Sequence, residues 1–324
     1  MCTAVSFTSG DHYFGRNLDL EYHYHEQVAV TPRGYPLPFR SGEVLQNHYA
    51  MIGMAMVDKG YPLYYDATNE AGLSVAGLHF PGNAVYHKPE AGKINIASFE
   101  LIPWLLGKYE TVSQVRKALG NVQITIAAYS DDLPPSPLHW LVSDKDESIV
   151  IECMADGLHI YDDPVGVLTN NPPFPYHMYR MADYMGLSRE PAINSFSEDV
   201  KITPYSHGLA AFGLPGDLSS SSRFVRAAYI KLNSVCDSSE NASISQFFHI
   251  LSGVAQRKGM VVARDEMYEY TVYSSCCNTS NGVYYYTTYE NSQITAVDMH
   301  KCDLQSKEVI SFPLVRSQQF RREN

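Results

Sequence analysis

The stretch MCTAVSFTSGDHYFGRNLD (residues 1–19) places a cysteine directly after the initiator methionine. Removal of Met1, which a small second residue permits, would leave Cys2 with both a thiol and a free α-amine. The thiolate is a nucleophile with a reference pKa of about 8.5, and an α-amine titrates at about 7.7–8.0. Such an amine can take the thiol proton itself, so no histidine base is needed. Cys2 is therefore a candidate N-terminal nucleophile, unless it is an accidental small residue near the chain start.

The same stretch predicts a β-hairpin. Apolar and polar residues roughly alternate over residues 4–8, which is typical of a strand, and Ser9-Gly10-Asp11 is a turn signal. The returning strand would bring Arg16 and Asp19 close to Cys2. A guanidinium there would favour the thiolate, and a carboxylate would hold the α-ammonium. The alternative is that Arg16 and Asp19 form an ordinary surface ion pair.

The opening MCTAVSF…YFGRNLDLEY resembles the N-terminal nucleophile hydrolases of the choloylglycine hydrolase group, which contains bile salt hydrolases and penicillin V acylases. Matching blocks follow in order at residues 69–84, 138–152, 166–174, 213–229, 247–254 and 284–299. The resemblance covers nearly the whole chain. It implies a single domain over residues 1–324 with an α+β fold, a four-layer αββα sandwich built on two stacked antiparallel sheets.

The pattern along the chain agrees with that architecture. Helices are expected at 98–120, where Thr111 suits an N-cap and Gly120 a stop, and at 175–187, 223–234 and 242–256, where Ser243 could cap. Strands are expected at 26–32, 50–57, 62–67, 73–80, 138–143, 148–153, 157–161, 166–169, 269–275, 283–289, 292–299 and 308–315. Grouped strands and helices favour a layered α+β fold over a βαβ repeat.

Composition excludes several function classes. The net charge of −11 over 324 residues argues against binding to nucleic acid or to anionic membranes, so an anionic substrate needs locally placed arginines. No long apolar run predicts a transmembrane helix, and the start lacks a signal peptide pattern, so we expect a cytoplasmic protein. The six cysteines are too sparse for a disulfide framework.

No metal or cofactor is expected. Cys276, Cys277 and Cys302 lack zinc-ligand spacing, and His23 with His25 makes an incomplete site. The chemistry proposed for the chain needs neither group.

The resemblance also implies the remaining catalytic residues. The oxyanion would be bound by the side-chain amide of Asn170 and by the backbone N–H of residue 79, and Arg223 matches the second active-site arginine. Bile salt hydrolases usually carry Asn where this chain has His79; a backbone donor survives that change, while an imidazole adds a titrating group. Without the resemblance, Asn170 reads as an Asx-turn residue and Arg223 as a surface residue near a helix start. Arg226 is expected to be structural or in a surface ion pair.

The resemblance is closer to bile salt hydrolases than to penicillin V acylases, and it implies conjugated bile salts with glycine or taurine tails as substrates. A rigid steroid with an anionic tail needs a broad apolar pocket with polar groups at one end. Candidate walls are Leu20, Tyr24, Met56, Tyr65 and Phe80, each of which could equally be core. The alternatives are penicillin V, another N-acyl amide such as an acyl-homoserine lactone, or a non-catalytic binding protein. The resemblance further implies a homotetramer.

Overall fold

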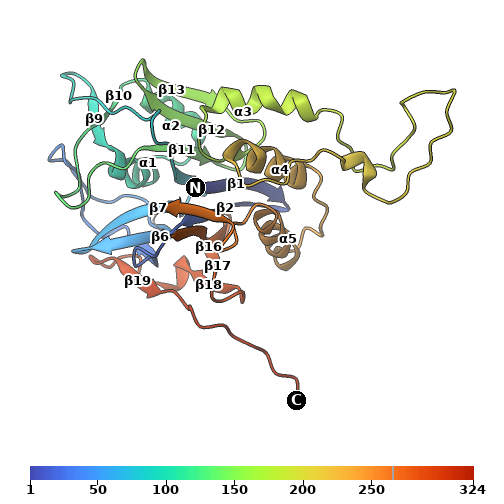
Figure 1. The fold of residues 1–324 in the computed structure, drawn as a ribbon. Helices are drawn as coiled ribbons and strands as arrows, with labels where there is room; N and C mark the ends of the chain where they lie inside the picture. The colour runs from blue at the N-terminus through green and yellow to red at the C-terminus, as the bar shows by residue number, and fades with distance from the viewer. Residues whose placement is uncertain (265) are drawn as a thin grey trace.

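The computed structural model describes residues 1–264 and 266–324, and two large β-sheets stack at its centre (Figure 1). Sheet A has the strand order β14-β1-β2-β16-β17-β18, with β15 paired to β16. The bounds of its strands are β1 Cys2–Ser9, β2 Asp11–Leu20, β14 Val167–Leu168, β15 Val261–Arg264, β16 Met267–Asn278, β17 Val283–Thr288 and β18 Thr295–Asp298. All these pairings are antiparallel.

Sheet B has the order β13-β12-β11-β8-β7-β6-β3-β19 and is also antiparallel. Its strands are β3 Gln27–Thr31, β6 Met51–Asp58, β7 Tyr61–Asn69, β8 Ser74–His79, β11 Leu138–Ser143, β12 Ser148–Met154, β13 Gly157–Asp162 and β19 Ile310–Pro313. Two small sheets pair β4 Leu37–Pro38 with β5 Val44–Leu45, and β9 Ile94–Ala97 with β10 Val122–Thr125.

Helices cover the outer faces of both sheets. Helix α1 (Leu101–Lys108) packs on β7 and β8 of sheet B, and α2 (Val112–Leu119) shares that apolar core. Helices α4 (Ser220–Leu232) and α5 (Glu240–Ser252) pack on β1 and β2 of sheet A, and α3 (Phe174–Arg180) lies against α4. Four short 3-10 helices are described: η1 Ser98–Glu100, η2 Met181–Tyr184, η3 Leu209–Ala211 and η4 Met299–Lys301. The predicted four-layer α+β sandwich is confirmed.

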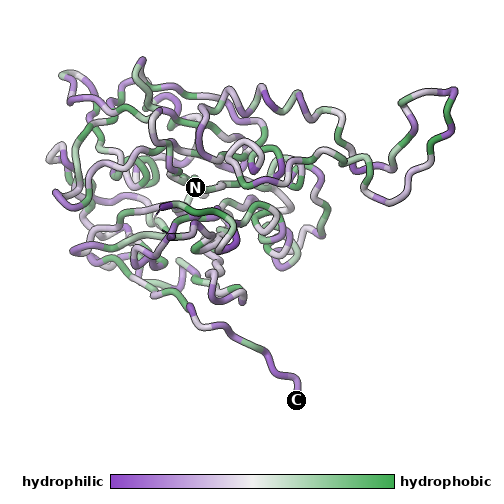
Figure 2. Tube along the Cα trace, in the orientation of Figure 1, coloured by the Kyte–Doolittle hydropathy of each residue, from purple (hydrophilic) through white to green (hydrophobic). Residues whose placement is uncertain are grey.

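The hydropathy pattern follows the layers. In Figure 2 apolar stretches run along the strands and helices of the sandwich, whereas the C-terminal tail is largely polar. The core that fills the space between the sheets includes Cys2, Val5, Leu78 and Leu141. Cys2 therefore lies at the edge of the central apolar layer, where water is largely excluded.

The predicted N-terminal hairpin is present. Its register pairs Cys2 with Leu18 and Ala4 with Arg16. Gly15 is required here because a Cβ atom would lie 2.0 Å from the carbonyl oxygen of Ser275 on β16. Close approach of these strands sets β2 centrally in sheet A, with its charged residues next to Cys2.

Some local predictions need correction. Thr111 caps α2 through its hydroxyl, as expected, but the cap position of α5 is Ser239. Ser243 is buried inside α5, where its hydroxyl donates to the Ser9 carbonyl. Strands β9, β10 and β15 were not expected, since each is only four residues long and lacks a clear alternation.

Candidate active site

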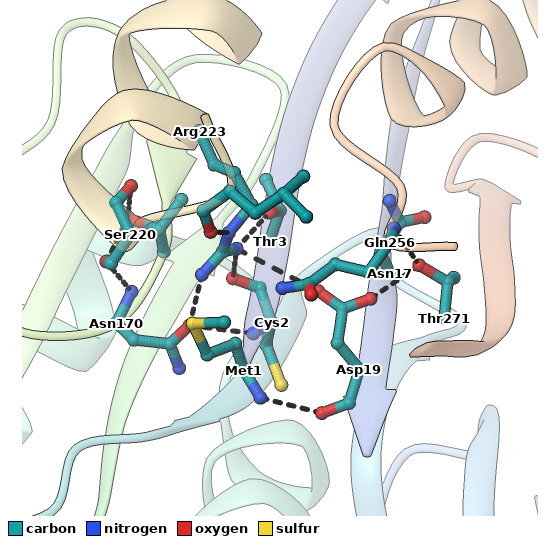
Figure 3. Close-up of polar contacts among 12 residues, drawn as sticks. Met1, Cys2, Thr3, Asn17, Asp19, Asn170, Ser220, Arg223, Gln256 and Thr271 are labelled. Carbon is teal, nitrogen blue, oxygen red and sulfur yellow. Dashed lines mark hydrogen bonds and ion pairs between the residues drawn. The ribbon is translucent and has the colours of Figure 1, made fainter. Parts of the chain in front are cut away.

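Cys2 begins β1 and is held through its own backbone. Its side chain is 2% exposed, its N–H donates to Asn170 Oδ1 at 2.7 Å, and its carbonyl accepts from Arg223 Nη1 (Figure 3). Met1 extends the ladder, because its amine donates to the Asp19 carbonyl at 2.7 Å and its carbonyl accepts from the Asp19 N–H at 2.9 Å. The position of Cys2 is thus fixed by contacts on both sides.

Arg16 crosses from sheet A to sheet B. Its buried guanidinium donates through Nη1 to the carbonyls of Tyr65 and Gly77, and Nη2 has no hydrogen-bond partner among the described residues. Burial would lower the pKa of Arg16, but the acidic groups of Cys2, Tyr273 and Asp66 outweigh it and raise this pKa. A charged guanidinium therefore lies near the Cys2 thiol.

Asp19 is also fully buried. Its Oδ1 accepts a hydrogen bond from the Thr271 hydroxyl at 2.6 Å, and its Oδ2 lies 3.9 Å from Arg223 Nη1. Arg16 and Asp19 accordingly do not form the surface ion pair that was the alternative. The hairpin brings both charges beside Cys2, as the sequence predicts.

Arg223 lies in the first turn of α4 and is fully buried, so the surface alternative for it is wrong. Besides Cys2, its guanidinium donates to the Thr3 hydroxyl at 2.7 Å and to Asn170 Oδ1 at 2.9 Å. Burial lowers the pKa of Arg223, against the opposing charges of Asp19 and Cys2. One side chain thus ties the start of β1 to the loop after β14.

Arg226, one turn later, is structural. Its guanidinium donates to the backbone carbonyls of Gly253, Pro215 and Asp217.

Asn170 projects its amide toward Cys2. Its backbone N–H donates to the Ser220 hydroxyl at 2.8 Å, and its Oδ1 accepts from Cys2 and Arg223 (Figure 3). Its Nδ2 donates to the His79 carbonyl at 2.7 Å. The neighbouring Asn171 is a separate case, because its amide donates to the Pro81 carbonyl at an exposed position.

His79 is the last residue of β8, and its carbonyl accepts the hydrogen bond from the Asn170 amide. The adjacent Phe80 N–H donates to the Pro137 carbonyl at 2.8 Å, toward β11. Because N–H and C=O groups alternate sides along a strand, those of His79 point away from β11. Burial lowers the pKa of the His79 imidazole, and the Met1 ammonium lowers it further. The N–H of residue 79 therefore points away from β11, and its role as an oxyanion donor stays a prediction.

The predicted pocket walls divide into two kinds. Leu20, Tyr24, Met56 and Tyr65 are partly exposed, and Leu20 and Tyr65 pack against the core that contains Cys2. Phe80 is a correction: it is fully buried and stacks on His139 with ring centroids 4.2 Å apart. A side chain enclosed in this way is core and not an accessible wall.

Among the described residues, no group of three or more His, Cys, Asp or Glu side chains could hold a metal ion. Within the same residues, no helix is long and apolar enough to cross a membrane.

The profile of linear amide C–N hydrolases, choloylglycine hydrolase family, matches residues 2–312. The chain belongs to the choloylglycine hydrolase family. It is 54% identical over 320 residues to a bile salt hydrolase/transferase of Lactiplantibacillus plantarum, with 99% of each chain covered. It is 42% identical to a conjugated bile acid hydrolase of Lactobacillus gasseri, over 88% of this chain and 92% of that one.

Solved structures agree with this family assignment. A variant of the conjugated bile acid hydrolase from Clostridium perfringens superposes with a TM-score of 0.92 at 34% identity, and each chain is fully covered. A penicillin V acylase from Agrobacterium tumefaciens gives 0.73 at 20% identity, over 98% of this chain and 92% of that one. The second likeness shows the fold alone.

Sequence reasoning missed several polar residues of this choloylglycine hydrolase site. Thr271 and Glu269 alternate on β16, so their side chains share the face that holds Asp19 and the chain start. Ser220 and His177 support Asn170, and His177 donates from Nε2 to the Asn170 carbonyl at 2.9 Å. The alternation of β16 was the one signal available, and it is equally typical of a core strand.

Two buried histidines are expected to make the fold less stable at acidic pH. Burial lowers the pKa of His12 and of His177 from 6.5 to about 4, with Asp144 partly opposing the shift at His12. Between pH 6.5 and 4 the unfolded chain binds protons that the folded chain does not. The free energy of unfolding therefore decreases as pH falls through this window, by about 2 kcal/mol per histidine between pH 7 and pH 5.

The measurement is the free energy of unfolding in urea at pH 7 and pH 5, for wild type and His177→Asn. The decrease from pH 7 to pH 5 is expected to be smaller in the variant by about 2 kcal/mol. Equal decreases in both proteins would contradict the prediction.

Proposed function

We propose that the chain, after loss of Met1, hydrolyses the amide bond of glycine- and taurine-conjugated bile salts through Cys2. The observation that carries this proposal is the double anchoring of Cys2, whose nitrogen and carbonyl are bound by Asn170 and Arg223. That nitrogen becomes the α-amine of the processed chain, so amine and thiol would be fixed together on one residue. The names of the relatives supply the substrate class.

In the proposed mechanism the α-amine takes the thiol proton, and the Cys2 sulfur attacks the amide carbonyl carbon. The oxyanion is bound between the Asn170 amide and the His79 N–H. To donate to it, Asn170 Nδ2 must break its hydrogen bond to the His79 carbonyl. The ammonium then protonates the leaving nitrogen, the C–N bond breaks, and a thioester remains. Water, deprotonated by the same amine, attacks the thioester, releases the bile acid and returns the thiol.

Arg16, Asp19 and Arg223 would hold this geometry. Arg16 and Arg223 place positive charge near the Cys2 sulfur, which attacks as an anion in this mechanism. The chain as a whole carries a net charge of −11, so this positive potential has to be local. Leu20, Tyr24, Met56 and Tyr65 stay proposed walls of the steroid pocket, since they are the partly exposed apolar side chains of the predicted set.

The test is amine release from glycocholate, taurocholate and penicillin V by the purified chain. We expect cleavage of both bile salts and an intact mass that lacks Met1. Cleavage of penicillin V alone would retain the mechanism and reject the substrate. No cleavage of any of the three by chain without Met1 would favour another acyl amide or a binding protein.

We also propose a homotetramer, supported by a projecting arm between η2 and α4 (Figure 1). The arm, residues 185–219, exposes the large apolar side chains of Met185, Ile193, Phe196, Tyr205 and Phe212. Apolar surface on an extended segment is typical of an interaction site. The cytoplasmic location expected from the sequence stays a prediction.

Replacing Phe196 and Phe212 together with serine is expected to convert the tetramer to smaller species. The measurement is light scattering during size-exclusion chromatography, with Phe320→Ser on the C-terminal tail as the control for an exposed phenylalanine. A double variant with the mass of the wild type would reject the arm as the interface.

A further inference from the structure

Two acceptors on neighbouring strands hold the α-ammonium of Met1. One is the Asp19 carbonyl on β2, and the other is the Glu269 carboxylate on β16, which forms an ion pair with it. The Glu269 side chain is 12% exposed. Burial raises the pKa of Glu269, and the Met1 ammonium opposes that rise. A carboxylate this enclosed is ionised at low cost only when it has a cationic partner.

Removal of Met1 takes this cation away and creates another at the nitrogen of Cys2. The new amine lies one residue further along β1, and a strand advances by about 3.3 Å per residue. A change of rotamer in the long glutamate side chain covers such a distance. In the processed chain Asn170 Oδ1 accepts one N–H of the ammonium, and two N–H groups remain to be bound.

Asp19 on β2 is another carboxylate near the chain start. Its Oδ1 accepts from the Thr271 hydroxyl, and its Oδ2, which has no hydrogen-bond partner among the described residues, lies 3.9 Å from Arg223, whose guanidinium opposes a protonated amine. The His79 imidazole at the end of β8 is an additional titrating group close to the chain start. Glu269 on β16 is a further carboxylate: among the described residues its one ion pair is with the Met1 ammonium, which departs with Met1, and Arg223 is a second positive charge nearby.

We propose that Glu269 is a positioning residue that binds the Cys2 α-amine after removal of Met1 and orients it for proton transfer. This inference rests on the proposed function. With Asn170 Oδ1 and Glu269 each accepting one N–H, the third proton of the ammonium is directed toward the leaving nitrogen. The carboxylate also favours the protonated amine, and it gains no proton itself in the cycle.

The test is an ¹⁵N NMR titration of the α-amine in chains labelled with ¹⁵N-cysteine, for wild type, Glu269→Gln and Glu269→Asp. The other five cysteine nitrogens are backbone amides and do not titrate. We expect the amine of Glu269→Gln to titrate about one pH unit lower than that of wild type, with Glu269→Asp in between. For glycocholate, kcat should fall about tenfold in Glu269→Gln, with KM nearly unchanged.

Glu240→Gln is the matched control, because Glu240 on α5 accepts from Asn278, Asn281 and Tyr285 around the turn between β16 and β17, at the opposite end of β16 from Glu269. Its amine should titrate like that of wild type. An amine titration in Glu269→Gln that also matches wild type, in chain shown by mass to lack Met1, would overturn the inference. Absence of bile salt cleavage by wild type would reject the proposed function, while the titration would still decide the role of Glu269.

Discussion

Replacing Cys2 with alanine is expected to lower kcat for glycocholate by on the order of 10⁴-fold or more, because no other group can form the thioester. The substitution removes only a sulfur atom and keeps the α-amine and its contact to Asn170. Amine release from glycocholate, followed with a ninhydrin or mass-spectrometric assay, measures the effect. Melting temperature should change little, since the free Cys2 thiol makes no hydrogen bond to any of the described residues.

Cys2→Ser is the informative companion. It keeps the shape of the site and the amine, and it replaces the thiol with a hydroxyl, a group that is in general far harder to deprotonate. We expect residual activity between that of wild type and Cys2→Ala. Retention of wild-type kcat by either variant would place the nucleophile elsewhere, and Cys276 and Cys277 are poor substitutes because burial raises the pKa of both thiols.

Replacing Asn170 with alanine is expected to lower kcat by about 10²–10³-fold, the cost of losing one oxyanion donor. The same change removes the acceptor of the Cys2 nitrogen, so it alone does not separate the two roles. Asn170→Asp does separate them. Aspartate keeps an oxygen for Cys2 and Arg223, but it presents a second oxygen where the donor was and repels the oxyanion.

For Asn170→Asp we therefore expect kcat as low as in Asn170→Ala, with an α-amine titration that still shows an anchored amine. Asn171→Ala is the control next in the chain, since its amide contacts the Pro81 carbonyl at the surface. It should retain nearly wild-type kcat. Loss of activity in Asn171→Ala, with Asn170→Ala active, would show that the two asparagines had been exchanged in the assignment.

The sequence was most informative where the relevant contacts are local. A hairpin with a short turn fixes its own register, so Arg16 and Asp19 could be placed beside Cys2 from the pattern of residues 1–19. Asn170 and Arg223 are distant in the chain, and only the family resemblance pointed to them. Residue type alone favoured a surface position for Arg223, because the acceptors that make its burial favourable exist only in the folded chain.

Other features lacked any local signal. Phe80 was predicted as a pocket wall, but its ring stacks on His139 inside the core. The prediction failed because the pattern of a strand does not show which of its apolar residues face an open pocket. Glu269 and Thr271 follow the alternation of an ordinary strand, and their function depends on β16 lying next to β2 in sheet A. Non-local strand pairing of this kind is not encoded in any one segment.

The ladder position of Met1 has a consequence for the timing of synthesis. Asp19 and Glu269 hold the Met1 amine in the finished sheet, so we expect an aminopeptidase to remove Met1 more readily before β16 pairs with β2. The ribosome makes residue 19 early and β16 (Met267–Asn278) near the end. At 5–20 residues per second, this leaves roughly 10–50 s for processing. Under the proposed processing, a chain that folds with Met1 in place would lack a free cysteine amine, so early removal of Met1 would raise the yield of active protein.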